Sequence, residues 1–288
     1  MPMRILIAGA RGMLGTDLVE ELGPAHQVAG LGHGDLDITD AEHCKARVFE
    51  AHPEIVINAA AMTDVDGCES REEEAFLVNG HGAGNLAAAA AAIGSAVIHF
   101  STDYIFDGTK DEPYGEDDTP NPRSIYGKSK LAGEQLVRAF CADHLILRTS
   151  WVFGSHGKNF IRTIAQAARS QGTLRVVNDQ RGSPTCTIDL ARHTRRMLEA
   201  GCRGTYHLTN SGSCTWYELA VRVVEWLGLD VPVLPVASTE YPRPASRPAN
   251  SVLANGRLAR ERFPLMRPWQ EAAEEYVKTG LRRVTNDE

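Results

Sequence analysis

The chain has 288 residues, of which 43% are hydrophobic and 23% charged, and its formal net charge is −7. This composition is ordinary for a globular protein in water. The acidic balance argues against a nucleic-acid-binding protein, which usually carries a basic stripe. No apolar run reaches the roughly 20 residues that a membrane helix needs, and the first residues lack the features of a signal peptide. Neither a membrane nor a nucleic-acid partner is therefore expected.

The six cysteines are scattered, and no two have the C-x-x-C spacing of a redox or zinc motif. Scattered cysteines in a chain of this length are typical of reduced thiols. They favour a cytoplasmic location.

Apolar runs that end at glycine or polar residues predict five strands, at 4–8, 27–31, 55–58, 96–100 and 144–148. Helical patterns separate them, at about 15–22, 40–51, 71–92 and 124–140. Apolar strands that alternate with helices imply a parallel sheet covered on both faces. We therefore expect residues 1–150 to form a Rossmann-type, doubly wound α/β domain.

The alternation becomes looser after residue 150. Further strands are predicted at 174–177 and 206–208, and helices at 188–199, 216–227 and 269–281. The five prolines between residues 231 and 250 cannot lie in helix interiors, so this stretch should be irregular. We expect parts of 174–210 to complete the first domain, and residues 151–288 to form mainly a smaller, substrate-binding lobe.

A glycine-rich turn follows the first strand and opens a helix, with Gly9, Gly12 and Gly15 in a G-x-x-G-x-x-G spacing. A dinucleotide-binding turn needs this context. Glycines let backbone N–H groups approach a pyrophosphate, and the helix N-terminus favours its charge. A tight turn without a ligand is the alternative.

The end of the second strand bears on the type of dinucleotide. Proteins that bind NAD usually have an acidic residue there for the ribose hydroxyls. Here that strand ends in Leu31-Gly32-His33-Gly34, and Asp35 and Asp37 come later. Arg11, inside the glycine turn, could pair with a 2′-phosphate. We predict a preference for NADPH, with NADH as an alternative.

Tyr126 and Lys130 lie four residues apart in a predicted helix and so share one face. An ammonium beside a phenol stabilises the phenolate and lowers a pKa that is ordinarily about 10. A tyrosine tuned in this way can donate a proton to a carbonyl oxygen near neutral pH. The alternative is a surface tyrosine beside a solvated lysine.

The glycine turn and the Tyr-x-x-x-Lys spacing resemble the extended short-chain dehydrogenases/reductases. More specific motifs, taken together, are similar to the dTDP-4-dehydrorhamnose reductase family over nearly the whole chain; they lie at 58–66, 101–108, 126–134, 148–153, 178–185 and 245–251. The resemblance implies that NAD(P)H reduces the C4 ketone of dTDP-4-dehydro-L-rhamnose to dTDP-L-rhamnose. This is the final step of dTDP-rhamnose biosynthesis.

The resemblance also implies roles for individual residues. Tyr126 would be the proton donor, Lys130 would tune it and contact the nicotinamide ribose, and Thr102 would place a hydroxyl on the substrate oxygen. The implied cofactor-binding residues, with Gly9, Arg11 and Gly15 added from the turn itself, are Gly9, Arg11, Gly12, Met13, Leu14, Gly15, Asp37, Ile38, Ala61, Met62, Thr63, Phe100, Tyr126 and Lys130.

Four residues are expected to contact the substrate. Thr102, Asp103 and Trp151 follow from the resemblance. Arg247 lies beside a proline in a polar loop and could bind a diphosphate through both terminal nitrogens. A surface arginine is the alternative for that position.

The residues after Thr102 favour reduction over elimination. Related sugar-nucleotide dehydratases carry Asp-Glu at this place, whereas here Asp103 is followed by Tyr104. The base for removing water is therefore missing, and ketone reduction needs only a hydride and one proton. Two alternatives stay open: reduction of a different 4-keto nucleotide sugar, and a non-catalytic regulatory subunit. The presence of Thr102, Tyr126 and Lys130 argues against the second.

The ten histidines show no zinc-type spacing, so no metal site is predicted from the residues. Some members of the family are associated with magnesium at a subunit contact, but the sequence does not place such a site. The expected partners are a dTDP-sugar substrate and, in a homodimer, a second copy of the chain.

Overall fold

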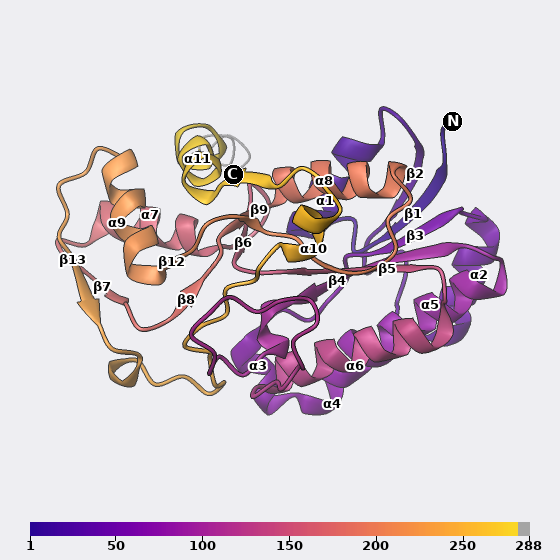
Figure 1. The fold of residues 1–288 in the computed structure, drawn as a ribbon, viewed down its shortest axis with the longest axis horizontal. Coiled ribbons are helices and arrows are strands. Elements are labelled where there is room, and N and C mark those ends of the chain that lie inside the picture. Colours follow the sequence, from indigo (N-terminus) through magenta and orange to yellow (C-terminus); the bar gives the residue numbers. More distant parts are fainter. Residues whose placement is uncertain (282–288) are drawn as a thin grey trace.

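The computed structural model describes residues 1–281 and contains a central sheet of six parallel strands (Figure 1). The strand order is β10-β5-β4-β3-β1-β2. This confirms the Rossmann-type α/β fold and the five predicted N-terminal strands. The bounds are β1 (Arg4–Ala8), β2 (Gln27–Leu31), β3 (Ile55–Asn58), β4 (Ala96–Thr102), β5 (His144–Thr149) and β10 (Gly204–His207).

Helices cover both faces of this sheet (Figure 1). Ile5 and Ile7 of β1 pack on one face with Leu18, whereas Leu6 packs on the other with Leu86. Successive strand side chains point to opposite faces, so an uninterrupted apolar strand needs a helix on each side. One face carries α1 (Met13–Leu22) and α8 (Thr187–Glu199), and the other carries α2 (Ala41–Ala51), α5 (Ala83–Ala92) and α6 (Ile125–Phe140).

The helical pattern predicted for 71–92 is divided in the structure. It consists of α4 (Glu72–Ala75), the π-helical segment η1 (Phe76–Gly82) and α5, and a further short helix, α3 (Val65–Ser70), precedes it. A Cβ on Gly82 would lie 2.7 Å from the Ile38 side chain, so the chain runs unusually close to its neighbour there. The widened turn coincides with this contact.

A second apolar cluster lies outside the central sheet, on the side of the molecule formed by α7 and α9 (Figure 1). Its helices are α7 (Phe160–Ser170), α9 (Trp216–Trp226), α11 (Trp269–Glu275) and the π-helical η4 (Tyr276–Gly280). Short strand pairs join the remaining segments: β6 (Val152–Phe153) with β9 (Thr185–Cys186), β8 (Arg181–Gly182) with β12 (Cys214–Thr215), and β11 (Asn210–Ser211) with β14 (Met266–Pro268). The short helices η2 (Asp103–Ile105), η3 (Ser238–Glu240) and α10 (Gly256–Arg260) complete the described elements.

The prediction that residues 231–250 are irregular throughout is wrong for β13 (Val233–Val236). This strand pairs in parallel with β7 (Leu174–Val177), and Pro235 lies opposite Val176. Since the sheet has two strands, β13 is an edge strand with one side free of ladder hydrogen bonds. A proline is tolerated on such a strand because its missing N–H is not needed there.

The six cysteines are free thiols, as the sequence predicted, and all except Cys202 are buried. None of the helices within residues 1–281 combines the length and apolar character needed to cross a bilayer.

Gly127 sets how closely α6 approaches the end of β4. A Cβ at this position would lie 2.1 Å from the Tyr104 carbonyl oxygen. We expect Gly127→Ala to lower the free energy of unfolding by about 1–3 kcal/mol, since α6 must move away. Gly80→Ala is the matched control, because its Cβ would meet the Ala132 side chain at an ordinary 3.5 Å. Urea unfolding of both variants measures the difference, and equal stabilities would contradict the prediction.

Candidate active site

The predicted site residues converge at one edge of the sheet. The glycine turn follows β1, residues 61–63 follow β3, and Thr102 ends β4. β1, β3 and β4 are neighbours and parallel, so their carboxyl ends lie together. The helix α6 brings Tyr126 and Lys130 to the same place, and Lys130 Nζ donates to the Phe100 carbonyl oxygen at 2.7 Å.

Two of the three turn glycines are required by the packing of the backbone itself. Gly9 has a φ of 80°, which favours glycine, and a Cβ there would lie 2.6 Å from the Ala60 nitrogen. A Cβ on Gly15 would lie 2.0 Å from the Gly9 carbonyl oxygen. These positions hold α1 tightly against the ends of β1 and β3.

Gly12 is the least crowded of the three, because its nearest obstacle to a Cβ is the Gly9 oxygen at 3.2 Å. It is also the N-cap of α1, without a side-chain hydrogen bond to the first amides of the helix. A bare helix N-terminus at the carboxyl edge of a parallel sheet is a favourable place for a pyrophosphate. The turn therefore fits a dinucleotide.

Arg11 lies across the end of β2. A Cβ on Gly32 would meet the Arg11 Cδ at 2.7 Å, and Arg11 Nη2 pairs with Asp35 Oδ2 at 2.9 Å. Close by in sequence, Asp37 accepts hydrogen bonds from the hydroxyl and amide of Thr39, which lower the pKa of its carboxyl. The structure thus places one arginine and two carboxylates around the end of β2.

Asn79 links the loop after β3 to α6, and sequence analysis missed it. Its Oδ1 accepts from the Met62 amide at 2.8 Å, and its Nδ2 donates to the Met62 carbonyl at 3.1 Å. The same Nδ2 lies 3.0 Å from the Ser129 hydroxyl. Nothing in the local sequence marks this asparagine, because its partners come from two distant segments.

The expected effect of Lys130 on Tyr126 is not what the structure shows. Burial raises the pKa of Tyr126 above its usual range, and the Thr102 hydroxyl only partly offsets this. The Lys130 ammonium donates to the Phe100 carbonyl oxygen. It is not among the groups that shift the pKa of the Tyr126 phenol. The prediction of a lowered pKa is therefore wrong for this structure. A raised pKa keeps the phenol protonated, which is the state that a proton donor needs.

Thr102 and Asp103 form a buried pair beside Tyr126. The Thr102 hydroxyl donates to Asp103 Oδ1 at 3.0 Å and accepts from the Tyr104 amide at 3.2 Å. Burial raises the pKa of Asp103 to about 6, although the hydroxyls of Ser251 and Thr102 favour the ionised form. The protonation state of Asp103 consequently decides whether the Thr102 proton is free for another acceptor.

The Trp151 ring packs against Trp216 and Gly182. It stacks on Trp216 with centroids 3.3 Å apart and planes at 4°, and a Cβ on Gly182 would clash with its indole. Its φ of 45° is rare for a bulky residue and is held by these contacts.

Arg247 is engaged by the chain itself. Its Nη1 and Nη2 donate to the two carboxylate oxygens of Asp66 at 2.9 and 2.8 Å. Instead of leaving the guanidinium free for a diphosphate, this pair ties the proline-rich segment to α3.

A buried charge network lies behind Lys130. Glu134 accepts from Arg148 Nε and Nη2, both at 2.9 Å, and from Arg138 at 2.8 Å. Burial favours the neutral acid, but the hydrogen bonds and charge of Arg148 lower the pKa of Glu134 to about 2. Glu134 and Arg148 lie in two of the motifs on which the family resemblance rests, but the sequence analysis gave them no role. Arg148, a charged residue near the end of an apolar strand, was the sequence signal that could have indicated this buried network.

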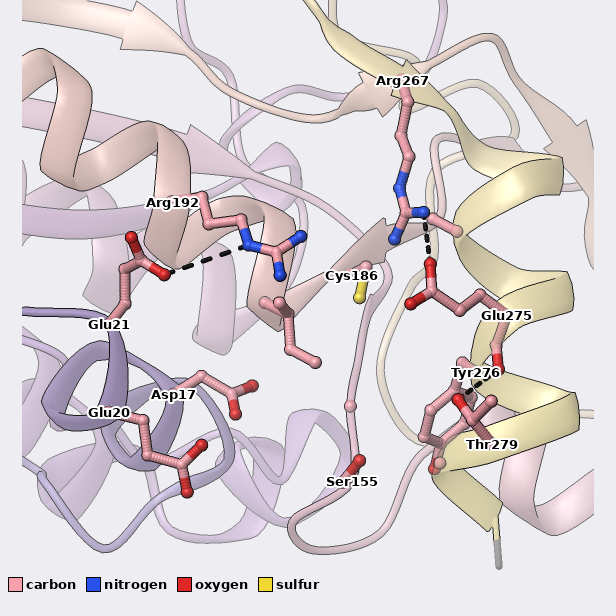
Figure 2. A pocket seen from close by; sticks show the side chains of 14 residues that line it. Asp17, Glu20, Glu21, Ser155, Cys186, Arg192, Arg267, Glu275, Tyr276 and Thr279 are labelled. Carbon is pink, nitrogen blue, oxygen red and sulfur yellow. Dashed lines mark hydrogen bonds and ion pairs between the residues drawn. The ribbon is translucent and has the colours of Figure 1, made fainter.

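A cavity of about 330 Å³ lies between α1, α8 and α11, and Tyr126 is not among its lining residues (Figure 2). Its charges are mixed: Glu21 faces Arg192 at 3.9 Å, and Glu275 pairs with Arg267. Within residues 1–281, no three His, Cys, Asp or Glu side chains are grouped so that they could hold a metal ion. None of the described residues is therefore assigned to a magnesium ion.

The chain matches the family model described as the RmlD substrate binding domain over residues 3–282. It belongs to this family. It is 40% identical to the dTDP-4-dehydrorhamnose reductase of Burkholderia thailandensis, over 94% of this chain and 96% of the relative. It is also 40% identical to the dTDP-4-keto-6-deoxy-D-glucose reductase of Streptomyces niveus, over 94% and 96% of the two chains.

A solved structure of a relative has the same fold. The dTDP-4-dehydrorhamnose reductase of Bacillus anthracis, in complex with NADP, superimposes with a TM-score of 0.92 at 37% identity. The match covers 100% of both chains. The family expected from the sequence motifs is thereby confirmed.

The Glu134 carboxylate should make stability depend on acid pH. Its pKa is about 2 in the folded chain against 4.5 ordinarily, so its contribution is present above pH 4.5 and is lost as the pH falls towards 2. We expect Glu134→Gln to lower the free energy of unfolding by about 3 kcal/mol at neutral pH. The difference should shrink towards pH 2. Urea unfolding across this range measures it, with Glu50→Gln on the surface of α2 as control, and a difference independent of pH would contradict the assignment.

Proposed function

We propose that this chain reduces the C4 ketone of dTDP-4-dehydro-L-rhamnose to dTDP-L-rhamnose. The main support for this proposal is that Tyr126, Lys130 and Thr102 converge beside a glycine turn that fits a dinucleotide. Relatives of nearly full-length coverage bear the name of this reaction, which supports the proposal. The bound dihydronicotinamide supplies the hydride.

In this proposal Tyr126 gives the proton to the ketone oxygen while the hydride reaches C4, so that C=O becomes CH–OH. The raised pKa of Tyr126 keeps its proton available at neutral pH. Thr102 donates a second hydrogen bond to the same oxygen. It can do so when Asp103 is protonated, because the Thr102 proton is otherwise given to that carboxylate. Lys130 holds the ribose next to Tyr126.

The cofactor side follows from the glycine turn. The amides of Gly12, Met13 and Leu14 would receive the pyrophosphate, and Arg11 the 2′-phosphate of NADPH. The position of Arg11 at the end of β2 supports a preference for NADPH. The other proposed contacts are Gly9, Gly15, Asp37, Ile38, Ala61, Met62, Thr63, Phe100, Tyr126 and Lys130.

The substrate side would be shared between the two parts of the chain. We propose that residues 1–150, completed by α8 and β10, hold the cofactor, and that most of 151–288 forms the substrate lobe. Asp103 and Trp151 would contact the sugar. Arg247 would shape the site by holding its loop on Asp66.

One rival function rests on a specific observation. A relative of equal identity is named for a different keto sugar, dTDP-4-keto-6-deoxy-D-glucose. The same catalytic residues would serve both substrates, so turnover of the two sugars side by side decides between them.

The Tyr126→Phe variant tests the proton donor. We expect its kcat with fresh dTDP-4-dehydro-L-rhamnose and NADPH to fall at least about 100-fold. NADPH affinity should stay within a small factor, since the ring remains. Tyr241→Phe, at an exposed position, is the control. Loss of NADPH absorbance and NMR of the product give the readout. Undiminished turnover by Tyr126→Phe would refute the role, and a wild type that binds NADPH without turnover would favour another sugar or a regulatory subunit.

The Arg11→Ala variant tests the cofactor preference. Removing a charge-assisted contact of about 1.5–3 kcal/mol should raise the KM for NADPH roughly 10-fold or more. The KM for NADH should change little, because NADH lacks the 2′-phosphate. NADH therefore serves as the control within the same variant. Steady-state kinetics with both dinucleotides measure this, and a wild-type KM lower for NADH than for NADPH would overturn the preference.

A further inference from the structure

We infer that Trp216 is a positioning residue: together with Gly182, it holds the Trp151 indole in the orientation in which that ring contacts the sugar. The inference rests on the proposed function, because it takes Trp151 as a contact of the sugar. Trp216 belongs to the substrate lobe and acts on the sugar through Trp151. The affinity for the sugar therefore depends on the stacking of these two rings.

Trp151 has a backbone conformation that a bulky side chain seldom adopts, with a φ of 45°. Such a conformation persists only where its surroundings fix it. The Ser150 hydroxyl donates to the Ser183 carbonyl oxygen at 2.7 Å, and the Trp151 carbonyl oxygen accepts from the Thr185 amide at 3.2 Å. These bonds fix the backbone, so the orientation of the indole is left to the packing around the ring.

That packing comes from Trp216 and Gly182. The rings of Trp151 and Trp216 stack with centroids 3.3 Å apart and planes at 4°. A Cβ on Gly182 would lie 2.3 Å from Trp151 Cε2, so the indole lies against the Gly182 backbone. Loss of the Trp216 ring would release the indole, and a side chain at Gly182 would displace it.

One strand pair holds both neighbours of the indole. β8, which contains Gly182, pairs with β12, which ends one residue before Trp216. Trp216 is the first residue of α9, and a capping box formed by Thr215 and Glu218 fixes the start of that helix. Phe160, the first residue of α7, packs on the Trp216 ring with centroids 4.5 Å apart. The Trp216 ring is thus held by contacts that do not involve Trp151.

The indole begins from the strand beside the reacting groups. β4 and β5 are parallel neighbours with Thr102 opposite Thr149, so Trp151 comes two residues after the partner of Thr102. In the proposed mechanism Thr102 bonds the ketone oxygen, and the Trp151 ring packs against the same sugar. A ring that is already fixed loses little side-chain freedom when the sugar binds. Trp216 therefore serves binding and takes no part in hydride or proton transfer.

Steady-state kinetics distinguish this role from a catalytic one. We expect Trp216→Leu to raise the KM for the dTDP-sugar about 10-fold, because a stacked aromatic pair is lost. The kcat and the KM for NADPH should change less than about 2-fold, since the groups that transfer the hydride and the proton are untouched. Trp216→Phe keeps a flat ring for stacking and should restore most of the affinity.

Trp226→Leu is the matched control, because Trp226 is a half-buried tryptophan of the same helix whose aromatic neighbour is Trp269, with centroids 6.3 Å apart. It should keep the wild-type KM. Circular dichroism gives a readout besides activity, because stacked indoles produce an exciton couplet. The Trp151–Trp216 pair is the closer one, so the couplet should fall more in Trp216→Leu than in Trp226→Leu.

Gly182→Ala tests the same indole from its other neighbour, and it decides the matter if Trp216→Leu does not fold. Its Cβ would displace the Trp151 ring, so the KM for the sugar should rise while kcat is kept. An unchanged KM in either variant that folds overturns the inference. A lower kcat at unchanged KM, or an equal rise of KM in Trp226→Leu, overturns it too, because a general weakening of the lobe would give that result.

The wild type separates this inference from the proposed function. If it turns over neither sugar, the proposed function fails, and the dissociation constant of dTDP-L-rhamnose, measured by titration calorimetry, replaces KM. Weaker binding by Trp216→Leu and Gly182→Ala than by Trp226→Leu then supports the inference, and equal constants overturn it. A wild type that does not bind dTDP-L-rhamnose contradicts both.

Discussion

The parallel direction of the central strands is the constraint on which the site depends. Parallel neighbours cannot be joined by a tight turn, so each strand returns through a helix and every carboxyl end is followed by a loop at the same edge. The register that pairs Ala8 with Asn58, and Asn58 with His99, places the glycine turn, residues 61–63 and Thr102 side by side. The backbone contacts of Gly9 and Gly15 then fix α1 against this edge.

Burial decides the charge states in the site more than proximity of charges does. It raises the pKa of Tyr126 and Asp103 and lowers that of Lys130. For Glu134, two arginines on the carboxylate oxygens are strong enough to reverse the effect of burial. Before substrate binds, the site therefore holds a protonated Tyr126 phenol, an Asp103 carboxyl with a pKa of about 6 and a Lys130 ammonium with a pKa of about 8. That inventory suits a reaction that consumes a proton.

Local patterns in the sequence were sufficient for the strands of the central sheet and for the motifs, because apolar runs and glycine spacing are local properties. They were insufficient where a contact between segments distant in the sequence determines the local structure. The widened turn at η1 coincides with the approach of Ile38 to Gly82, and β13 pairs with β7. The environment of Tyr126 likewise depends on burial by segments far along the chain. Helical spacing alone suggested the wrong direction for its pKa.

The segment 245–251 links the substrate side to the chemistry. Arg247 is bonded to Asp66, and Asn250 donates to the Lys110 carbonyl at 2.8 Å, so the segment is anchored on both sides of the site. Burial raises the pKa of Asp103 to about 6, and the hydroxyl of Ser251, the residue after Asn250, partly offsets this rise. Since Asp103 governs the Thr102 proton, a shift of this segment on substrate binding would alter the hydrogen bond available to the ketone. In the proposed mechanism, such a shift would couple recognition of the sugar to polarisation of its carbonyl.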